Sequence, residues 1–210
     1  MMSANHSEEL TLIEMTRRRV KPGTGSSLQM LQERTAMNRW PDLRDSLRGV
    51  QWAVVGGVAT RAYMAERMTK DLDILVRMTD GEEVISRLKQ GGHQVVSPLA
   101  LPGYLLRSPD GVEVDVLFGQ YDWLNEAFGQ LKTDSAGYPV LALSYLVLMK
   151  FEAGRTQDWA DVSRMLGFAS DNDLDEVRKV VSRYSPEDVE DLESLIFIGK
   201  KERETPASIE

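Results

Sequence analysis

The chain of 210 residues contains no cysteine and only two histidines, His6 and His93. The absence of cysteine excludes disulfide bonds, thiolate catalysis and cysteine metal sites. Two histidines are too few for a zinc site rich in histidine. If the protein binds a metal, oxygen ligands must hold it, which favours magnesium, manganese or calcium over softer ions.

Long apolar runs and an excess of basic charge are also missing. No run approaches the roughly 20 residues that a helix needs to cross a bilayer. The start, "MMSANHSEEL", is polar and acidic and does not resemble a signal peptide. We therefore expect a cytoplasmic protein with no membrane partner. The net charge of −8 disfavours a broad nucleic-acid-binding surface, although it is compatible with a local basic groove.

Composition and periodicity divide the chain into four segments. Residues 1–45 are expected to form a polar tail and a helix, because "SLQMLQERTAMNRW" has apolar residues at helical spacing. Residues 46–140 alternate apolar strands with helices, residues 141–198 are predicted to be helical, and residues 199–210 form a polar tail. The predicted fold class is α+β, a mixed β-sheet with flanking helices followed by a C-terminal helical region.

Two aspartates stand on one of the predicted strands, "DLDILV". Side chains two residues apart on a strand point to the same face, so Asp71 and Asp73 lie side by side, about 6.6 Å apart at their Cα atoms. Leu72 and Ile74 point to the other face, into a core. Two carboxylates on one face repel each other unless a cation neutralises them. The alternative is an exposed strand face with no ligand, which is the more common meaning of this pattern alone.

A pair of glycines, Gly56-Gly57, ends the preceding apolar run and begins a helix expected over residues 58–67. Glycine lets the backbone approach a ligand closely, and the N–H groups at a helix start favour an anion such as a phosphate. Taken alone, such a pair is more often a tight turn.

Together these features resemble a known signature. "VGG", thirteen further residues and then "DLDI" are similar to the glycine turn and aspartate pair of the DNA polymerase β-type nucleotidyltransferase superfamily. The resemblance implies a nucleotidyltransferase-like core at 46–140, where the glycines contact a nucleoside triphosphate (NTP) and the two aspartates hold two divalent ions, Mg²⁺ or Mn²⁺. It also implies a third carboxylate on a later strand. "VEVDVLFG" offers Glu113 and Asp115 on one strand face, and we favour Asp115.

A second resemblance narrows the family. "LVLMKFEAGRTQDWADVSRML" forms one long helix or two helices joined near Gly154, and it is similar to a helix of the AbiEii-like branch of small bacterial nucleotidyltransferases. There a lysine, an arginine and two acids follow one another. The matching residues are Lys150, Arg155, Asp158 and Asp161. The resemblance implies that Lys150 contacts the triphosphate, whereas the alternative is a plain Lys–Asp surface pair.

Arg67 and Thr69, in the lead-in "RMTKDLDIL", also fit the AbiEii-like branch, and we include both among the predicted nucleotide-binding residues. The implied reaction is metal-dependent transfer of a nucleoside monophosphate from an NTP to a hydroxyl group of RNA, such as a tRNA 3′ end, of a protein, or of a small molecule such as an aminoglycoside. By the same resemblance the protein is a candidate toxin with an antitoxin partner. Two alternatives are a catalytically silent nucleotide- or partner-binding protein of the same fold and a cation-stabilised interaction module of another fold.

Overall fold

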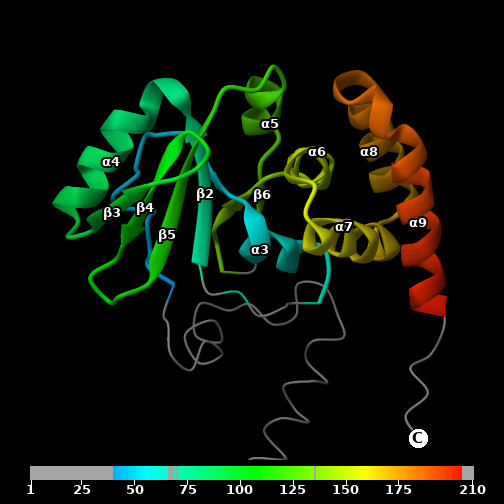
Figure 1. Cartoon of the computed structure of the whole chain (residues 1–210), viewed down its shortest axis with the longest axis horizontal. Helices are drawn as coiled ribbons and strands as arrows, with labels where there is room; N and C mark the ends of the chain where they lie inside the picture. Colours follow the sequence, from blue (N-terminus) through cyan, green and yellow to red (C-terminus); the bar gives the residue numbers. More distant parts are fainter. Residues whose placement is uncertain (1–39, 66–68, 70, 135, 205–210) are drawn as a thin grey trace, which may run out of the picture.

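The computed structural model describes residues 40–65, 69, 71–134 and 136–204. In this part of the chain the strands form one mixed sheet, in the order β3-β4-β5-β2-β1-β7-β6 (Figure 1). The strands are β1 (Trp52–Val54), β2 (Asp71–Arg77), β3 (Gln94–Pro98), β4 (Gly103–Arg107), β5 (Glu113–Gly119), β6 (Lys132–Thr133) and β7 (Pro139–Val140). The helices are α3 (Gly56–Ala59), η1 (Thr60–Ala62), η2 (Met78–Asp80), α4 (Gly81–Gln90), α5 (Leu124–Gly129), α6 (Leu143–Ala153), α7 (Thr156–Phe168), α8 (Asp171–Tyr184), η3 (Pro186–Asp188) and α9 (Val189–Glu204). The predicted α+β class is confirmed.

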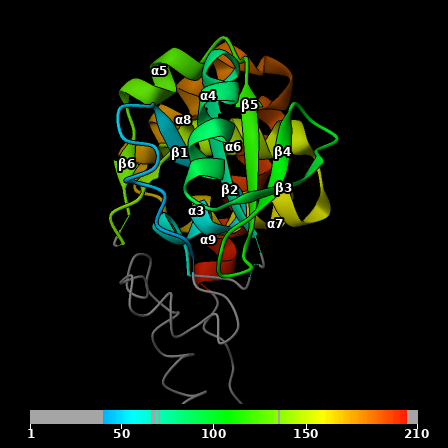
Figure 2. The same ribbon diagram turned by 90° about the vertical axis from the view of Figure 1, so that its left-hand side faces the viewer.

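The centre of the sheet is a parallel pair, β2 and β5, with antiparallel neighbours β1 and β4 on either side. Their residues alternate between two faces, as strand geometry requires. One face carries buried Leu72, Ile74 and Val116 and is covered by α4, which lies across the sheet in Figure 2. Phe118 shares that face and would collide with any side chain at Gly81, at the start of α4. The other face is left to Asp71, Asp73 and Asp115, and to the helices that follow.

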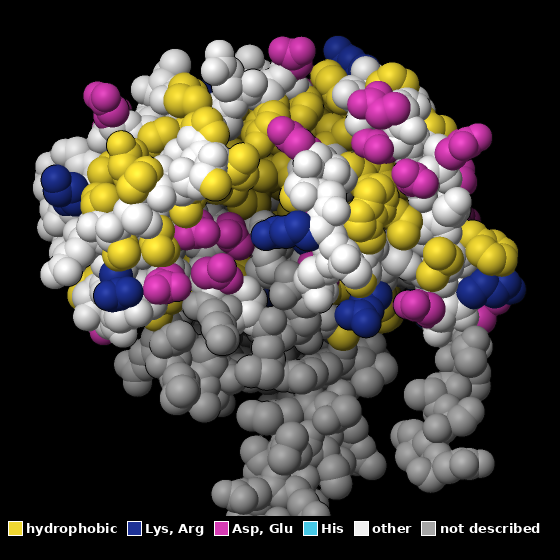
Figure 3. Space-filling model, viewed as in Figure 1, with side chains coloured by type: hydrophobic (Ala, Val, Ile, Leu, Met, Phe, Trp, Pro, Cys, Tyr) yellow, Lys and Arg dark blue, Asp and Glu magenta, His cyan; other side chains and the backbone are white. Residues whose placement is uncertain are grey.

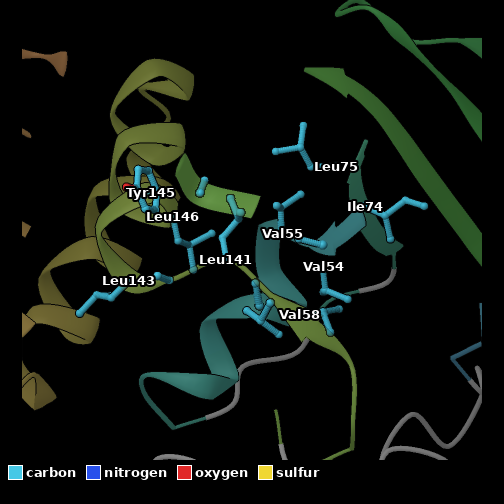
Figure 4. Close-up of a cluster of buried hydrophobic side chains, with 14 of the residues drawn as sticks. Val54, Val55, Val58, Ile74, Leu75, Leu141, Leu143, Tyr145 and Leu146 are labelled. Atoms are coloured by element: carbon cyan, nitrogen blue, oxygen red, sulfur yellow. The ribbon is translucent and has the colours of Figure 1, made fainter. Parts of the chain in front are cut away.

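The opposite face of the sheet packs against α6, an apolar helix buried almost all round. Leu75 and Val55 from the sheet side meet Leu141 and Leu146 in this layer (Figure 4). Helix α6 in turn packs against α7 and α8, and α7 packs against α9. The predicted segment boundaries stay a prediction, and both the sheet and the helical region contribute to one hydrophobic core. Among the described helices, none combines the length and apolarity that crossing a bilayer demands.

Some elements differ from the sequence-based expectation. The helix expected over 58–67 is shorter: α3 ends at Ala59 and continues only as the 3₁₀ turn η1. The Thr60 hydroxyl donates to the Gly57 carbonyl (2.8 Å), a local bond typical of a helix that is about to end. Gly154, with φ +61°, separates α6 from α7, so the later segment forms two helices. The helix expected near residues 27–40 lies almost entirely outside the described residues.

A buried ion pair ties the glycine-turn segment to the hairpin of β6 and β7. Arg61 on η1 donates through Nε to Asp134 Oδ2 (3.0 Å), and the two side chains are only 2% and 1% exposed. The other Asp134 oxygen accepts from the backbone N–H groups of Ala136 and Tyr138. The Arg61 guanidinium also lies over the Tyr138 ring. Both Asp134 oxygens thus have hydrogen-bond donors, and the pair holds the segment that follows Gly56-Gly57 in place.

We predict that Arg61→Met destabilises the protein by about 3–5 kcal/mol, because it leaves the Asp134 carboxylate buried without its cation. Urea unfolding followed by circular dichroism measures the change. Arg178→Met is the matched control, since the Arg178–Glu193 pair is exposed and its loss should cost under about 1 kcal/mol. Equal losses in the two variants would contradict a special role for the buried pair.

Candidate active site

Three carboxylates converge on the open face of the sheet. Asp71 and Asp73 come from β2, and Asp115 comes from β5, whose parallel register places Asp115 directly beside Asp73. One carboxylate oxygen from each residue lies within 4.8 Å of the others, and all three residues are half-buried. Figure 3 shows acidic side chains gathered in a hollow between the sheet and the helices, with a basic side chain across from them. Such a set of oxygen donors can hold a divalent cation.

The predicted third carboxylate can now be placed. Glu113 sits beside Asp71 in the strand register, but its carboxylate faces Arg107 on β4, with Nη2–Oε1 at 3.4 Å. In the described part of the chain the three-acid cluster contains Asp115 and leaves Glu113 outside. The structure thus brings together the three acids that the sequence favoured. Glu113 lies outside this cluster and is paired with Arg107.

Gly56 and Gly57 are directly coupled to Asp73. Gly56 adopts φ +60°, and a Cβ atom built there would lie 1.8 Å from Asp73 Oδ2. The Gly57 backbone N–H donates a hydrogen bond to the Asp73 carboxylate, and Val55 N–H donates to the Asp73 carbonyl (2.9 Å). The glycine turn is therefore built around this aspartate. Its predicted contact with phosphate stays a prediction, and the geometry adds a second reason for glycine at position 56.

The cluster carries an unfavourable concentration of negative charge. Burial, then the charges of Asp71 and Asp115, raise the pKa of Asp73 from 3.8 to about 7, although the Gly57 N–H and Arg155 act in the opposite direction. Burial also raises the pKa of Asp115, helped by Asp71 and Glu113. A bound cation would reverse these shifts, because it favours the ionised carboxylates. The donor set and its charge thus fit a divalent ion.

The other predicted residues on the approach to β2 are Arg67 and Thr69. The Thr69 hydroxyl donates to Asp71 Oδ1 (2.7 Å), so it orients a carboxylate of the cluster. A nucleotide contact of Thr69 stays a prediction. Arg67 lies outside the described residues.

Lys150, near the end of α6, is buried. Its side chain is 4% exposed, and Nζ donates to Asp158 Oδ1 (3.0 Å) and Asp161 Oδ2 (2.7 Å), both of which are buried on α7. Gly154 makes this meeting feasible, because the turn between α6 and α7 brings the two helices together at their facing ends. The structure pairs Lys150 with buried acids rather than surface acids, and its predicted contact with a triphosphate stays a prediction.

Arg155, just after the turn, is the exposed member of this group. Its side chain is 75% exposed, and its Nε and Nη2 donate to the two oxygens of Asp158 at 2.7 and 3.3 Å. That bond to Asp158 raises the pKa of Arg155, and the charges of Asp73 and Asp71 add to the rise. The guanidinium is thus close enough to the carboxylate cluster to interact with it across the hollow.

Sequence reasoning missed one member of the group. Gln157 donates from Nε2 to Asp161 Oδ1 (2.9 Å) and so orients that carboxylate beside Lys150. The available signal was its spacing: on one helix, residues four apart lie on the same side.

Comparison with known proteins adds distant similarities only. No family model matches the chain, and no relative is found among curated proteins. Similar solved structures include the solution structure of the antibiotic-resistance factor ANT(2'')-Ia, at 14% identity over 94% of this chain and 96% of that one, with a TM-score of 0.42. The crystal structure of ANT(2'')-Ia in complex with adenylyl-2''-tobramycin is 16% identical over 85% and 98%, with a TM-score of 0.42. TM1012 from Thermotoga maritima, assigned as a nucleotidyltransferase, is 17% identical over 62% and 86%, with a TM-score of 0.44. At these values the similarities assign neither a family nor a substrate to this chain.

We predict that Gly56→Ala weakens Mn²⁺ binding by more than tenfold, because the new methyl group displaces the Asp73 carboxylate from the cluster. Gly49→Ala is the matched control: Gly49 also has a positive φ, +83°, but a Cβ there has nothing within 4 Å. Both variants carry the backbone strain, and only Gly56→Ala carries the collision. Calorimetric titration with Mn²⁺ compares them. Equal binding by the two variants would contradict the coupling of Gly56 to Asp73.

A pH dependence follows from the raised pKa of Asp73. Between pH 4 and about 7 the folded state keeps a proton that the unfolded state has released, so this group's contribution to stability falls as the pH rises through that window. Mg²⁺ competes with that proton, and its affinity should therefore increase up to about pH 7. Thermal melts without metal, from pH 5 to 8, should show the fall in the wild type and a smaller fall in Asp73→Asn. Parallel curves for the two proteins would contradict the assignment.

Proposed function

We propose that the protein is a nucleotidyltransferase that moves a nucleoside monophosphate from an NTP to a hydroxyl acceptor. The observation that carries the proposal is the cluster of Asp71, Asp73 and Asp115 on two adjacent parallel strands, with a glycine turn against one side. The resemblance found in the sequence implies this arrangement, and the register of β2 and β5 is consistent with it.

The three aspartates would hold a divalent cation, Mg²⁺ or Mn²⁺, between the acceptor and the triphosphate. Once bound, such an ion lowers the pKa of an attacking hydroxyl and neutralises charge on the phosphates. That two ions bind, as the resemblance implies, stays a prediction. The pKa values of Asp73 and Asp115 are raised in the free protein, so ionising both carboxylates is unfavourable there and a bound cation would favour it.

The reaction itself needs one bond to form and one to break. The acceptor oxygen attacks the α-phosphorus, the bond from that phosphorus to the bridging oxygen of the β-phosphate breaks, and pyrophosphate leaves with the electron pair. By the resemblance, Asp115 would hold the ion at the acceptor and would accept the acceptor proton. The backbone N–H groups at the start of α3, beside Gly57, would donate to phosphate oxygens.

Finer assignments belong to the same proposal. The AbiEii-like branch, a toxin role with an antitoxin partner and residence in the cytoplasm are all predictions from the sequence. The acceptor is a hydroxyl of RNA, protein or a small molecule, and the experiment below is designed to separate these three classes.

The deciding experiment offers each α-labelled NTP, with magnesium or manganese, to total RNA, lysate protein and a panel of hydroxylated small molecules. We expect label on one acceptor class. If no acceptor becomes labelled but calorimetry shows that the protein binds an NTP, the result would instead support the catalytically silent alternative. Failure of the protein to bind any NTP would contradict the proposal as a whole.

We predict that Asp73→Asn abolishes transfer, by at least about 10³-fold, while the folded structure is retained, because it removes a charged ligand from the cluster. Asp115→Asn should have a comparable effect, and Glu113→Gln a much smaller one, since Glu113 faces Arg107. Label transfer is measured for each variant alongside its circular dichroism spectrum. Normal activity of Asp73→Asn would refute the metal-binding role of the cluster.

A further inference from the structure

Four charged side chains at the junction of α6 and α7 form one group linked by hydrogen bonds. Lys150, Asp158 and Asp161 are buried, at 4%, 2% and 0% side-chain exposure, and Arg155 is the only member that reaches solvent. Two carboxylates are matched by one ammonium and one guanidinium, so the group is electrically balanced. Without Arg155, the buried part would carry an excess negative charge, which is costly away from water.

The two carboxylates accept all the hydrogen bonds of the group, from Lys150 on the buried side and from Arg155 and Gln157 on the exposed side. Gln157 and Lys150 bind the two oxygens of Asp161, and Lys150 also binds Asp158 Oδ1. Asp158 then binds Arg155 through both of its oxygens. Lys150 therefore sets the orientation of the carboxylate that holds Arg155.

The outer end of the group lies at the start of α7, close to the glycine turn of the candidate active site. Helix α6, whose C-cap Gly154 directly precedes Arg155, packs against α3, and α3 begins at Gly56 beside Asp73. The Asp158 bonds use Nε and Nη2 of Arg155, and no hydrogen bond from its Nη1 is found among the described residues. The effect of the Arg155 charge on the pKa of Asp73 agrees with this placement. A guanidinium held on one side by a carboxylate loses less conformational freedom when its other N–H groups bind a phosphate.

We propose that Arg155 contacts the phosphate chain of the NTP and that Lys150 is a positioning residue for Arg155, with no phosphate contact of its own. The inference rests on the proposed function, since it assumes an NTP in the hollow. It assigns the phosphate contact to the exposed cation and explains why a lysine lies within the apolar sequence "VLMKF": its partners are the acids of α7.

The first test measures NTP binding without relying on turnover. The four common NTPs are titrated with magnesium into the full chain by calorimetry, and the one that binds most tightly is used. Arg155→Ala should weaken its binding by roughly ten- to hundredfold, as expected for loss of charge-assisted hydrogen bonds. Arg178→Ala removes an exposed, ion-paired arginine on α8 and should bind like the wild type.

The second test separates positioning from direct contact. Lys150→Met leaves the group one positive charge short and should weaken binding about as much as Arg155→Ala. The double variant Lys150→Met/Asp161→Asn restores the charge balance, with Asp158 and Arg155 left as a matched pair, and should recover binding to within about threefold of the wild type. The conclusion does not depend on the single lysine variant folding, because the double variant and Arg155→Ala carry the comparison.

Two results would overturn the inference alone. NTP binding by the double variant as weak as that of Arg155→Ala would show that Lys150 itself contacts phosphate. Wild-type affinity in Arg155→Ala would show that Arg155 does not. If the wild-type chain binds none of the NTPs, the proposed function fails and the inference fails with it, and this outcome is distinct from the other two.

Discussion

The mutual repulsion of three carboxylates is the constraint around which this structure is arranged. Their oxygens lie within 4.8 Å of one another because the register of β2 and β5 leaves Asp73 and Asp115 side by side. Burial of the alternate residues, such as Leu72 and Val116, holds each strand in that register, since a slip by one residue would turn them to the wrong face. The hydrophobic core thus holds together charges that would otherwise separate, and a bound divalent cation would reduce their repulsion.

The glycine turn shows how far this constraint extends into the backbone. Gly56 lacks a Cβ because Asp73 occupies the space, and the N–H of Gly57 stabilises the charged form of the same carboxylate. Arg61, which follows the turn, anchors it by a buried ion pair with Asp134, between β6 and β7. The Gly57 N–H and the Arg155 charge do not offset burial and the neighbouring negative charges, so the pKa of Asp73 is raised to about 7. The protein therefore keeps a carboxyl group with a shifted pKa here, as functional sites often do.

Sequence reasoning reached the parts of the site that local patterns determine. A period of two places Asp71 and Asp73 on one face, which depends only on neighbours along the chain. Asp115 was expected as the third acid through the resemblance to the nucleotidyltransferase signature. The collision between Gly56 and Asp73 depends on residues seventeen positions apart, so no local pattern could reveal it. The burial of Lys150 likewise follows from the turn at Gly154, where the sequence left open whether one helix or two would form. The early end of α3 was not predicted, and it goes with the hydrogen bond from the Thr60 hydroxyl to the Gly57 carbonyl.

The proposed function draws on both parts of the fold. The three acids come from the sheet, and an NTP carries its own negative charge, so under this proposal the cluster on the sheet offers the NTP no positive side chain of its own. Lys150 and Arg155 supply positive charge at the junction of α6 and α7. The two cations differ: Lys150 is buried and donates to two buried acids, whereas Arg155 donates to one of those acids while its side chain stays 75% exposed. Under the proposed function the helical region therefore takes part in the chemistry, because it carries the cation, Arg155, that complements the three aspartates.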